Sequence, residues 1–276
     1  EEKFEYIFHR ENMSNTLLSL PFIAIYFQYH TSSGVTLTPT SHLRDLGVII
    51  SDDLSWTRQI GNICNKARQM GAWVFSVFST RSTEVLLTLY KSLVRCHLEY
   101  CSPLWNPHKV SDIQQLEGVQ RSFTSKICGL RDLHYWDRLK QLSLMSLQRR
   151  RERYIVIHMW KLYNDRSSND LQIKFHEHKR HGVLAEVPAL KRGCKTRHST
   201  LYENSFRVLG PRLWNCIPKQ IRSSLILESF KEHLTRFMLK VPDKPPVRGC
   251  TPPNPNSILD WRSDKEASAF YGGWGL

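Results

Sequence analysis

The sequence predicts a mainly α-helical protein, in which a helical bundle follows a short β-hairpin and precedes a mobile C-terminal tail. Apolar residues recur every three or four positions between about residues 57 and 165, which is the spacing of amphipathic helices. Before this region, short alternating and β-branched runs end in turn-forming residues, as strands do. After residue 241 the composition shifts to Pro, Gly, Asn and Ser, which is typical of segments without a packed core.

The predicted strands lie ahead of the helices. Residues 35–38 alternate between apolar and polar side chains, and residues 45–50 form a short, largely apolar run. This run ends in the Ser-Asp-Asp sequence at 51–53, so we predict a strand that enters a turn there. Further upstream, the apolar run 17–29 is shorter than the roughly 20 residues of a membrane helix and contains Pro21, which favours a buried strand or a short helix.

The predicted helices are separated by residues that favour turns and helix ends. Ser82 is a candidate N-cap of the second helix, and Gly129 a candidate C-cap of the third. The predicted helices run from Trp56 to Phe78, from Ser82 to about His97, from Ser111 or Asp112 to just before Gly129, from Tyr135 to Tyr163, and from about Ile226 to Met238. We therefore expect a bundle in which one long fourth helix carries an arginine cluster at its middle.

These patterns divide the chain into five segments. They are an N-terminal segment without a pattern, the predicted strands, the helical bundle, a basic region that ends in an amphipathic helix, and the Pro/Gly-rich tail. Their predicted bounds are 1–30, 31–56, 57–165, 166–240 and 241–276.

The charge of the chain predicts an anionic partner. Lys and Arg number 39 against 25 Asp and Glu, which leaves a formal net charge of +14. Residues 141–200 hold 13 of the basic and 5 of the acidic residues, so +8 of this excess lies there. Nucleic acid is the first candidate partner and a membrane surface the second. The candidate phosphate-binding residues are Arg149, Arg150, Arg151, Arg153, Lys161, Lys179, Arg180, Lys191 and Arg192.

The arginine cluster at residues 149–153 has a second interpretation. On a helix, its side chains fan around more than half of the circumference, and Tyr154 and Trp160 offer stacking surfaces nearby. A solvated helix face with Glu152 and Asp137 as ionic partners is the structural alternative. The concentration of positive charge favours phosphate binding.

Two groups of residues resemble catalytic or metal sites. Asp52 and Asp53 follow an apolar run, as the metal-binding carboxylates of polymerases do, but no Asp lies well upstream of them on an earlier strand to complete such a site. We therefore interpret them as turn residues. His176, His178, His181, Cys194 and His198 contain residue types that bind zinc, but no second Cys lies near. We favour a polar or nucleic-acid-facing loop and predict neither a catalytic residue nor a metal ligand in this chain.

The cysteines indicate a reducing compartment. Seven Cys residues are scattered without a CxxC pair, which is unlike the dense, even-numbered pattern of small disulfide-stabilised domains. No signal-peptide pattern opens the sequence. We expect an intracellular protein, in the nucleus or the cytoplasm.

Several strings, in a fixed order, resemble one family. They are residues 44–48 (RDLGV), 54–60 with Leu54, Trp56 and Ile60, 98–107 (LEYCSPLWNP), 116–121 (LEGVQR), 135–142 (YWDRLKQL), 147–154 (LQRRRERY), 205–206 (SF), 213–218 (LWNCIP) and 230–234 (FKEHL). In this order they resemble the C-terminal part of reverse transcriptases of LINE-type non-LTR retrotransposons, of the jockey-like and chicken-repeat-like groups. The resemblance covers about residues 30 to 240. Residues 242–246 and 256–261 also look similar to the family.

This resemblance implies a polymerase thumb without most of its palm. It places Leu46, Gly47 and Val48 near the hairpin that grips the primer end, after the catalytic palm motif. The helices from Trp56 onward would be thumb-like, and the region beyond residue 140 would be the post-thumb segment. The family's aromatic-x-Asp-Asp motif precedes the Leu-Gly-Val string, so Asp52 and Asp53 do not match it. Magnesium is expected for the intact polymerase and no cofactor for this chain.

Three functional hypotheses follow. The first is a C-terminal fragment of an RNA-directed DNA polymerase that lacks the catalytic carboxylates but binds the backbone of a primer–template duplex. Its expected partners are RNA, DNA and the palm and fingers of the same polypeptide, with no membrane. The alternative is a host-retained basic nucleic-acid-binding module without a role in polymerisation. The third, a structural helical protein without a nucleic-acid role, would have its charge spread evenly, whereas here the charge is clustered.

Overall fold

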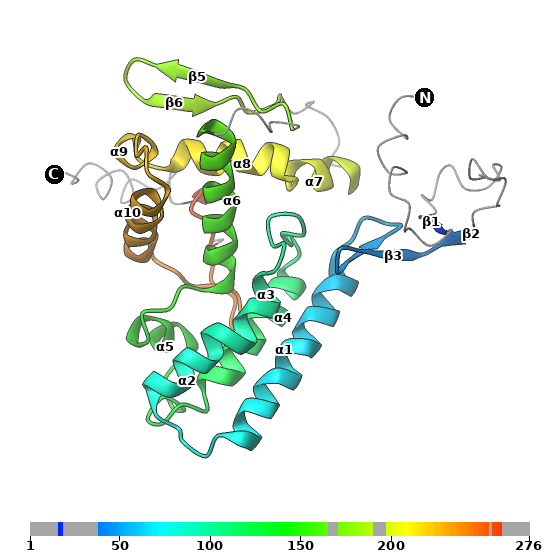
Figure 1. Ribbon diagram of the computed structural model, residues 1–276, viewed down its shortest axis with the longest axis vertical. Helices are drawn as coiled ribbons and strands as arrows, with labels where there is room; N and C mark the ends of the chain where they lie inside the picture. Colours follow the sequence, from blue (N-terminus) through cyan, green and yellow to red (C-terminus); the bar gives the residue numbers. More distant parts are fainter. Residues whose placement is uncertain (1–15, 19–37, 165–170, 190–196, 254–255, 261–276) are drawn as a thin grey trace. The chain divides into compact units, whose positions relative to one another are not determined.

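The computed structural model describes residues 16–18, 38–164, 171–189, 197–253 and 256–260 (Figure 1). The chain is mainly helical, as predicted, with short β-hairpins. It forms two compact units, residues 1–59 and 60–276. Within the described ranges, no helix combines the length and apolarity that crossing a bilayer requires.

The first unit contains two small two-stranded sheets. Strand β1 pairs in parallel with β2, and β3 pairs antiparallel with β4. Leu46 and Gly47 form the two-residue turn of the second pair, with φ of 45° and 87°. Positive φ at both positions is the type I′ geometry that matches the twist of a hairpin. The strands are β1 (Thr16–Leu18), β2 (Thr38–Thr40), β3 (His42–Asp45) and β4 (Val48–Ser51).

The hairpin refines the prediction for residues 45–50. They do not form one continuous strand, because the chain reverses at Leu46 and Gly47. The turn predicted after Ser51 is present. Asp53 donates its backbone N–H to Asp52 Oδ1 at 2.8 Å, and Asp53 Oδ1 accepts the N–H of Ser55 at 2.9 Å. These bonds hold the chain that leads into the first helix, which is the turn role predicted for the two aspartates.

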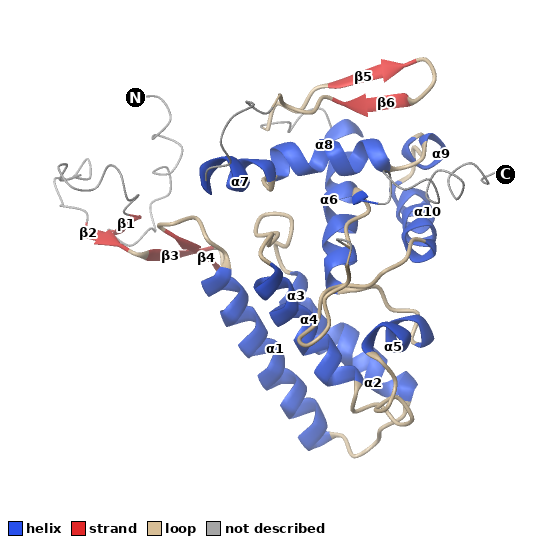
Figure 2. Cartoon of the chain, turned by 180° about the vertical axis from the view of Figure 1, so that it is seen from behind, coloured by secondary structure: helices blue, strands red, loops and turns tan. Residues whose placement is uncertain are grey.

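Helices and one hairpin form the second unit. The elements are α1 (Thr57–Val77), α2 (Thr83–Leu89), the π-helical turn η2 (Tyr90–Val94), α3 (Arg95–Glu99), α4 (Val110–Thr124), α5 (Tyr135–Gln141), α6 (Leu147–Asn164), β5 (Phe175–His178), β6 (Gly182–Ala185), α7 (Arg197–Glu203), α8 (Phe206–Cys216), α9 (Lys219–Arg222) and α10 (Leu227–Lys240). Figure 2 shows this arrangement from behind, with the β5–β6 hairpin beside α8.

Two predicted helices differ from the structure. The long fourth helix is two helices, α5 and α6, because the chain turns between them at Ser143, whose φ is 50°. The predicted second helix contains the π-helical turn η2, which has one residue more than an α-helical turn. This extra residue changes which side chains of the helix are buried. The buried face consists of Leu86, Tyr90, Val94 and Leu98, whereas Val85 is exposed.

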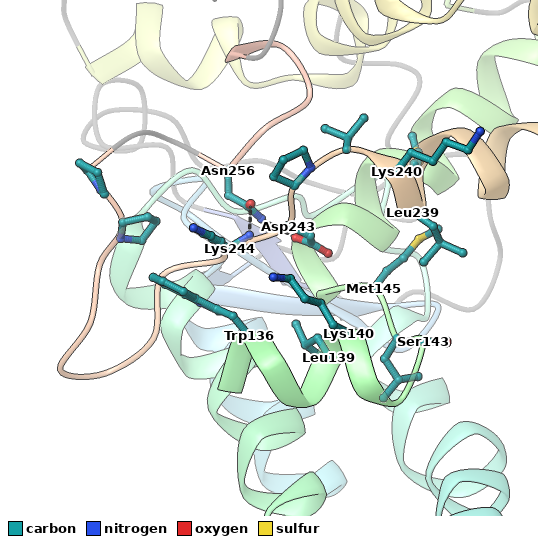
Figure 3. A pocket seen from close by; sticks show the side chains of 16 residues that line it. Trp136, Leu139, Lys140, Ser143, Met145, Leu239, Lys240, Asp243, Lys244 and Asn256 are labelled. Carbon is teal, nitrogen blue, oxygen red and sulfur yellow. Dashed lines mark hydrogen bonds between the residues drawn. The ribbon is translucent and has the colours of Figure 1, made fainter. Parts of the chain in front are cut away.

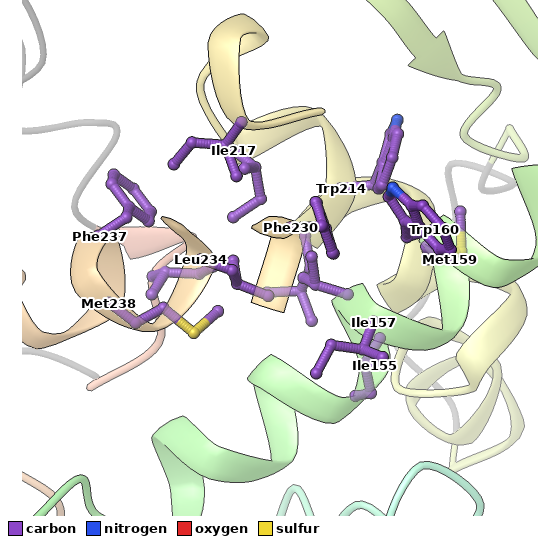
Figure 4. Packing of buried hydrophobic residues seen from close by; sticks show 14 of the residues in the cluster. Ile155, Ile157, Met159, Trp160, Trp214, Ile217, Phe230, Leu234, Phe237 and Met238 are labelled. Carbon is purple, nitrogen blue, oxygen red and sulfur yellow. The ribbon is translucent and has the colours of Figure 1, made fainter. Parts of the chain in front are cut away.

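A large apolar core joins α6, α8 and α10. Trp160 of α6 stacks on Phe230 of α10 with ring centroids 5.7 Å apart, and Trp214 of α8 lies 6.2 Å from the same ring (Figure 4). Trp160 is therefore a core residue and offers no stacking surface to a nucleic acid. Trp214 and Trp105 also fill the interior, whereas Trp73 is half exposed.

The C-terminal segment, residues 241–253 and 256–260, packs back onto the helices. Val247, Asn256 and Ile258 are buried. Trp136 Nε1 donates to the carbonyl of Pro245 at 2.9 Å. The predicted mobile tail is thus wrong for these residues, since polar side chains of α4, α5 and α6 bind their backbone. Residues 254–255 and 261–276 lie outside the described part.

A buried polar network crosses the helices of the second unit. Tyr90 donates to Gln120 Oε1 at 2.6 Å, Gln120 Nε2 to Tyr135 at 2.9 Å, and Tyr135 to Glu117 Oε2 at 2.7 Å. The backbone N–H of Gln148 donates to the other oxygen of Glu117 at 2.9 Å. Burial raises the pKa of Glu117 to about 7, although Arg151 and these donors oppose the rise.

The raised pKa of Glu117 predicts that the stability of the fold decreases as the pH rises. Below pH 4.5 the carboxyl group is neutral in both states, and between pH 4.5 and 7 the unfolded chain ionises while the folded chain resists. We expect this group to lower the free energy of unfolding by about 3 kcal/mol across that window. Urea unfolding at several pH values measures it, with Glu117→Gln as the comparison. An unchanged pH dependence in Glu117→Gln would contradict the assignment.

Candidate nucleic-acid interface

The arginine cluster of α6 divides between the interior and the surface. Arg149 and Arg151 are buried, with 0% and 1% of their surface exposed. Arg150 and Arg153 are only partly buried. The helical spacing of 100° per residue directs consecutive side chains to different neighbours. The expectation that this cluster acts as one phosphate-binding face is therefore wrong for Arg149 and Arg151.

Arg149 binds the C-terminal segment. Its Nη2 atom donates to the carbonyl oxygens of Pro242 and Asn256, each at 3.0 Å. Its Nε atom lies 3.6 Å from Glu152 Oε2, which also accepts the backbone N–H of Ile258 at 3.2 Å. Arg149 thus neutralises a buried carboxylate and satisfies two carbonyl groups of a segment about a hundred residues away in the chain.

Arg151 is the second interior arginine. Its Nε atom donates to Asn106 Oδ1 at 3.1 Å. Burial lowers its pKa, while Glu117 and Glu152 favour its charge. Both arginines therefore belong to the folded core, and we remove them from the candidate phosphate-binding set.

Three arginines surround one carboxylate at the surface of α3 and α6. Arg150 donates to both oxygens of Glu99, and Arg95 Nε lies 3.5 Å from Glu99 Oε1. Tyr154 donates to Glu99 Oε2 at 2.9 Å. Arg153 completes the group, and its Nε atom donates to Thr235 Oγ1 of α10 at 2.8 Å. We call Arg95, Glu99, Arg150, Arg153 and Tyr154 the Glu99 cluster.

The Glu99 cluster carries more positive than negative charge. Three guanidinium groups face one carboxylate, which leaves an excess of +2. Burial lowers the pKa of Arg95 and of Arg153, and repulsion from Arg150 lowers both further. Burial also opposes the charge of Arg150, but its bonds to Glu99 and Tyr154 prevail and raise its pKa. Within the described residues, Arg95 Nε is buried without a hydrogen-bond partner.

The positive surface continues onto α10. Arg153 borders an open depression together with Lys231, Glu232 and Arg236. Lys231 pairs with Glu228 and Arg236 with Glu232, so the excess charge there comes mainly from Arg153. Guanidinium groups bind phosphate oxygens in a bidentate manner and stay charged at any physiological pH. An additional anion at this surface would relieve the repulsion among the arginines. Arg95 was not predicted from the sequence. Next to Glu99 on the same helix it looks like an ordinary ion pair, and the other two arginines, Arg150 and Arg153, are more than fifty residues away in the chain.

The other candidate cations lie apart from this cluster along the chain. Lys161 is exposed near the end of α6, and Lys179 and Arg180 are exposed in the turn between β5 and β6. That hairpin is held in place by Arg222, whose guanidinium donates to the carbonyl oxygens of His181 and Val183. Lys191 and Arg192 lie outside the described residues.

The residues predicted to resemble a primer grip occupy the tip of the β3–β4 hairpin. Leu46 is 71% exposed in the turn, whereas Val48 is buried. A leucine with positive φ is unfavourable, and an apolar side chain exposed at such a position is unusual for a purely structural turn.

The histidines considered for zinc lie mostly on the β5–β6 hairpin. His178 Nδ1 accepts the backbone N–H groups of Arg180 and His181, each at 3.3 Å. Cys194 lies outside the described residues, as does the side chain of His198. In the part of the chain that the structure describes, no three His, Cys, Asp or Glu side chains converge as metal ligands would.

Comparisons with protein-family models, curated proteins and solved structures find no match to this chain.

Proposed function

We propose that this chain binds the phosphate backbone of a nucleic-acid duplex. In this proposal it is the C-terminal, thumb-like part of a non-LTR retrotransposon reverse transcriptase. The observation that carries the binding function is the excess of +2 in the Glu99 cluster, beside further cations of α10. Phosphate contacts need positive charge and reach but no base recognition. The polymerase assignment rests on the ordered family strings.

The hairpin tip supports the polymerase part of the proposal. Leu46 exposes an apolar side chain in a turn whose geometry favours Asn or Gly. Strained positions of this kind are often retained where the side chain has a role. We propose that Leu46 contacts the end of a primer strand held by the palm of such a polymerase.

The salt dependence of duplex binding tests the backbone-binding function. We expect the logarithm of the affinity for an RNA–DNA hybrid to fall linearly with the logarithm of salt concentration, with a slope of about −0.9 per phosphate neutralised. Fluorescence anisotropy between about 0.05 and 0.3 M salt measures this slope. Two duplexes of unrelated sequence should give equal affinities.

Two results would overturn the proposal. One is an affinity that does not change with salt for the folded chain, since backbone contacts release counterions. The other is a strong preference for one base sequence, which would indicate direct base readout instead.

A further inference from the structure

A pocket of about 740 Å³ lies between α5, the end of α10 and the C-terminal segment. Its volume falls within the range of small-molecule sites in proteins, which is roughly 300–1,000 Å³. The pocket exists only because residues 242–253 fold back over α5. Figure 3 shows side chains from all three segments around it.

Apolar side chains form most of the pocket wall. Leu139, Met145 and Leu239 contribute aliphatic or thioether surface, and Pro252 and Pro253 also line the pocket. The ring of Trp136 forms one edge, and its bond to the Pro245 carbonyl fixes its orientation. This wall suits a flat, weakly polar group.

Three lysines line the same pocket. Lys240, at the end of α10, points its ammonium group away from the other two. Lys140 extends from α5, and Lys244 comes from the C-terminal segment, with its Nζ atom 5.6 Å from the centre of the Trp136 ring. Neither lysine forms an ion pair within the described residues. Asp243 also lines the pocket. Its carboxylate accepts the N–H of Ser146 at 2.7 Å and the amide of Asn256 at 2.8 Å.

We propose that this pocket binds an unpaired nucleotide. The base lies against the apolar wall beside Trp136, and Lys140 and Lys244 bind its phosphate. An acidic side chain would need the two lysines but not the apolar wall, and an acyl chain would need the wall but not two cations. A nucleotide uses both. This inference rests on the proposed function and extends it from duplex backbone to an unpaired end.

The test compares a blunt duplex with the same duplex carrying an unpaired extension, and adds AMP as a free-nucleotide probe. We expect the extension to strengthen binding about tenfold, which is the scale of one stacked base with its phosphate. The double variant Lys140→Met/Lys244→Met should lose this preference and weaken AMP binding about tenfold, while blunt-duplex affinity changes little. Lys66→Met/Lys91→Met removes two exposed charges elsewhere and is the matched control.

The outcomes separate the two proposals. Equal affinity for blunt and extended duplexes, together with AMP binding that the pocket variant does not weaken more than the control, overturns the pocket assignment. AMP binding that only the pocket variant loses supports it, even where the extension has no effect, and identifies a free nucleotide as the ligand. Failure to bind any duplex contradicts the proposed function, and the AMP result still decides the pocket.

Discussion

Replacing Arg149 by methionine is expected to lower the free energy of unfolding by about 3–5 kcal/mol, the scale of breaking a buried ion pair. The guanidinium is fully buried, neutralises Glu152 and binds the carbonyl oxygens of Pro242 and Asn256. Methionine keeps the aliphatic volume but leaves the buried Glu152 carboxylate, the buried Asn256 carbonyl and the partly buried Pro242 carbonyl without this partner. Urea unfolding followed by circular dichroism measures the loss.

The control for Arg149→Met is the same substitution at the surface. Arg236 pairs with Glu232 at 2.7 Å, but both side chains are more than half exposed. Arg236→Met should therefore cost about 0.5 kcal/mol or less. Hydrogen exchange adds a local measurement, because the amides of Lys244 and Ile258 depend on the anchored segment. A loss below about 1 kcal/mol with unchanged exchange at both amides would show that Arg149 does not anchor it.

Replacing Arg150 and Arg153 together by glutamine is expected to weaken duplex binding at least about tenfold at 0.1 M salt. Each arginine is proposed to neutralise one phosphate, so the slope of affinity against salt should fall by about 2. The expected effect is the same for any duplex sequence, because neither side chain is proposed to reach a base. Fluorescence anisotropy over a salt series measures both quantities.

Glu99→Gln should have the opposite effect. It removes the carboxylate that Arg95 and Arg150 now share and raises the excess charge of the Glu99 cluster from +2 to +3. We expect tighter duplex binding and a steeper salt dependence. Arg68→Gln/Arg131→Gln removes two exposed charges elsewhere and controls for net charge. If Arg150→Gln/Arg153→Gln matches that control, and Glu99→Gln binds no tighter, the cluster is not a phosphate site.

Hydrophobic periodicity predicted most of the helices. The stripe from Ile60 to Val74 is buried along α1, and the last amphipathic helix buries Phe230, Leu234 and Phe237 as its spacing indicates. A helix that covers a core must repeat its apolar residues at the helical period, so this information is local. The break at Ser143 was missed, because an apolar pattern continues across it from Leu139 to Leu147.

The sequence alone could not distinguish the buried arginines of α6 from those at the surface. Five consecutive charged residues look alike in a helical pattern, and charged side chains are usually exposed. Arg149 and Arg151 are buried because Glu152, Asn106 and the carbonyl oxygens of a distant segment meet them. Glu152 is three residues from Arg149 on the same helix, but the other partners are 45 to 107 residues away in the chain.

The sequence by itself determined the helical class, the turn at Asp52 and Asp53, and the large positive charge, because each depends on residue type and short-range spacing. The tertiary structure alone decided which arginines remain at the surface, that Arg95 joins them around Glu99, and that the C-terminal segment closes a pocket over α5. Those features depend on which distant groups meet when the cores form. Burial favours a partner for each enclosed charge or carbonyl group, and the fold determines which partner is within reach.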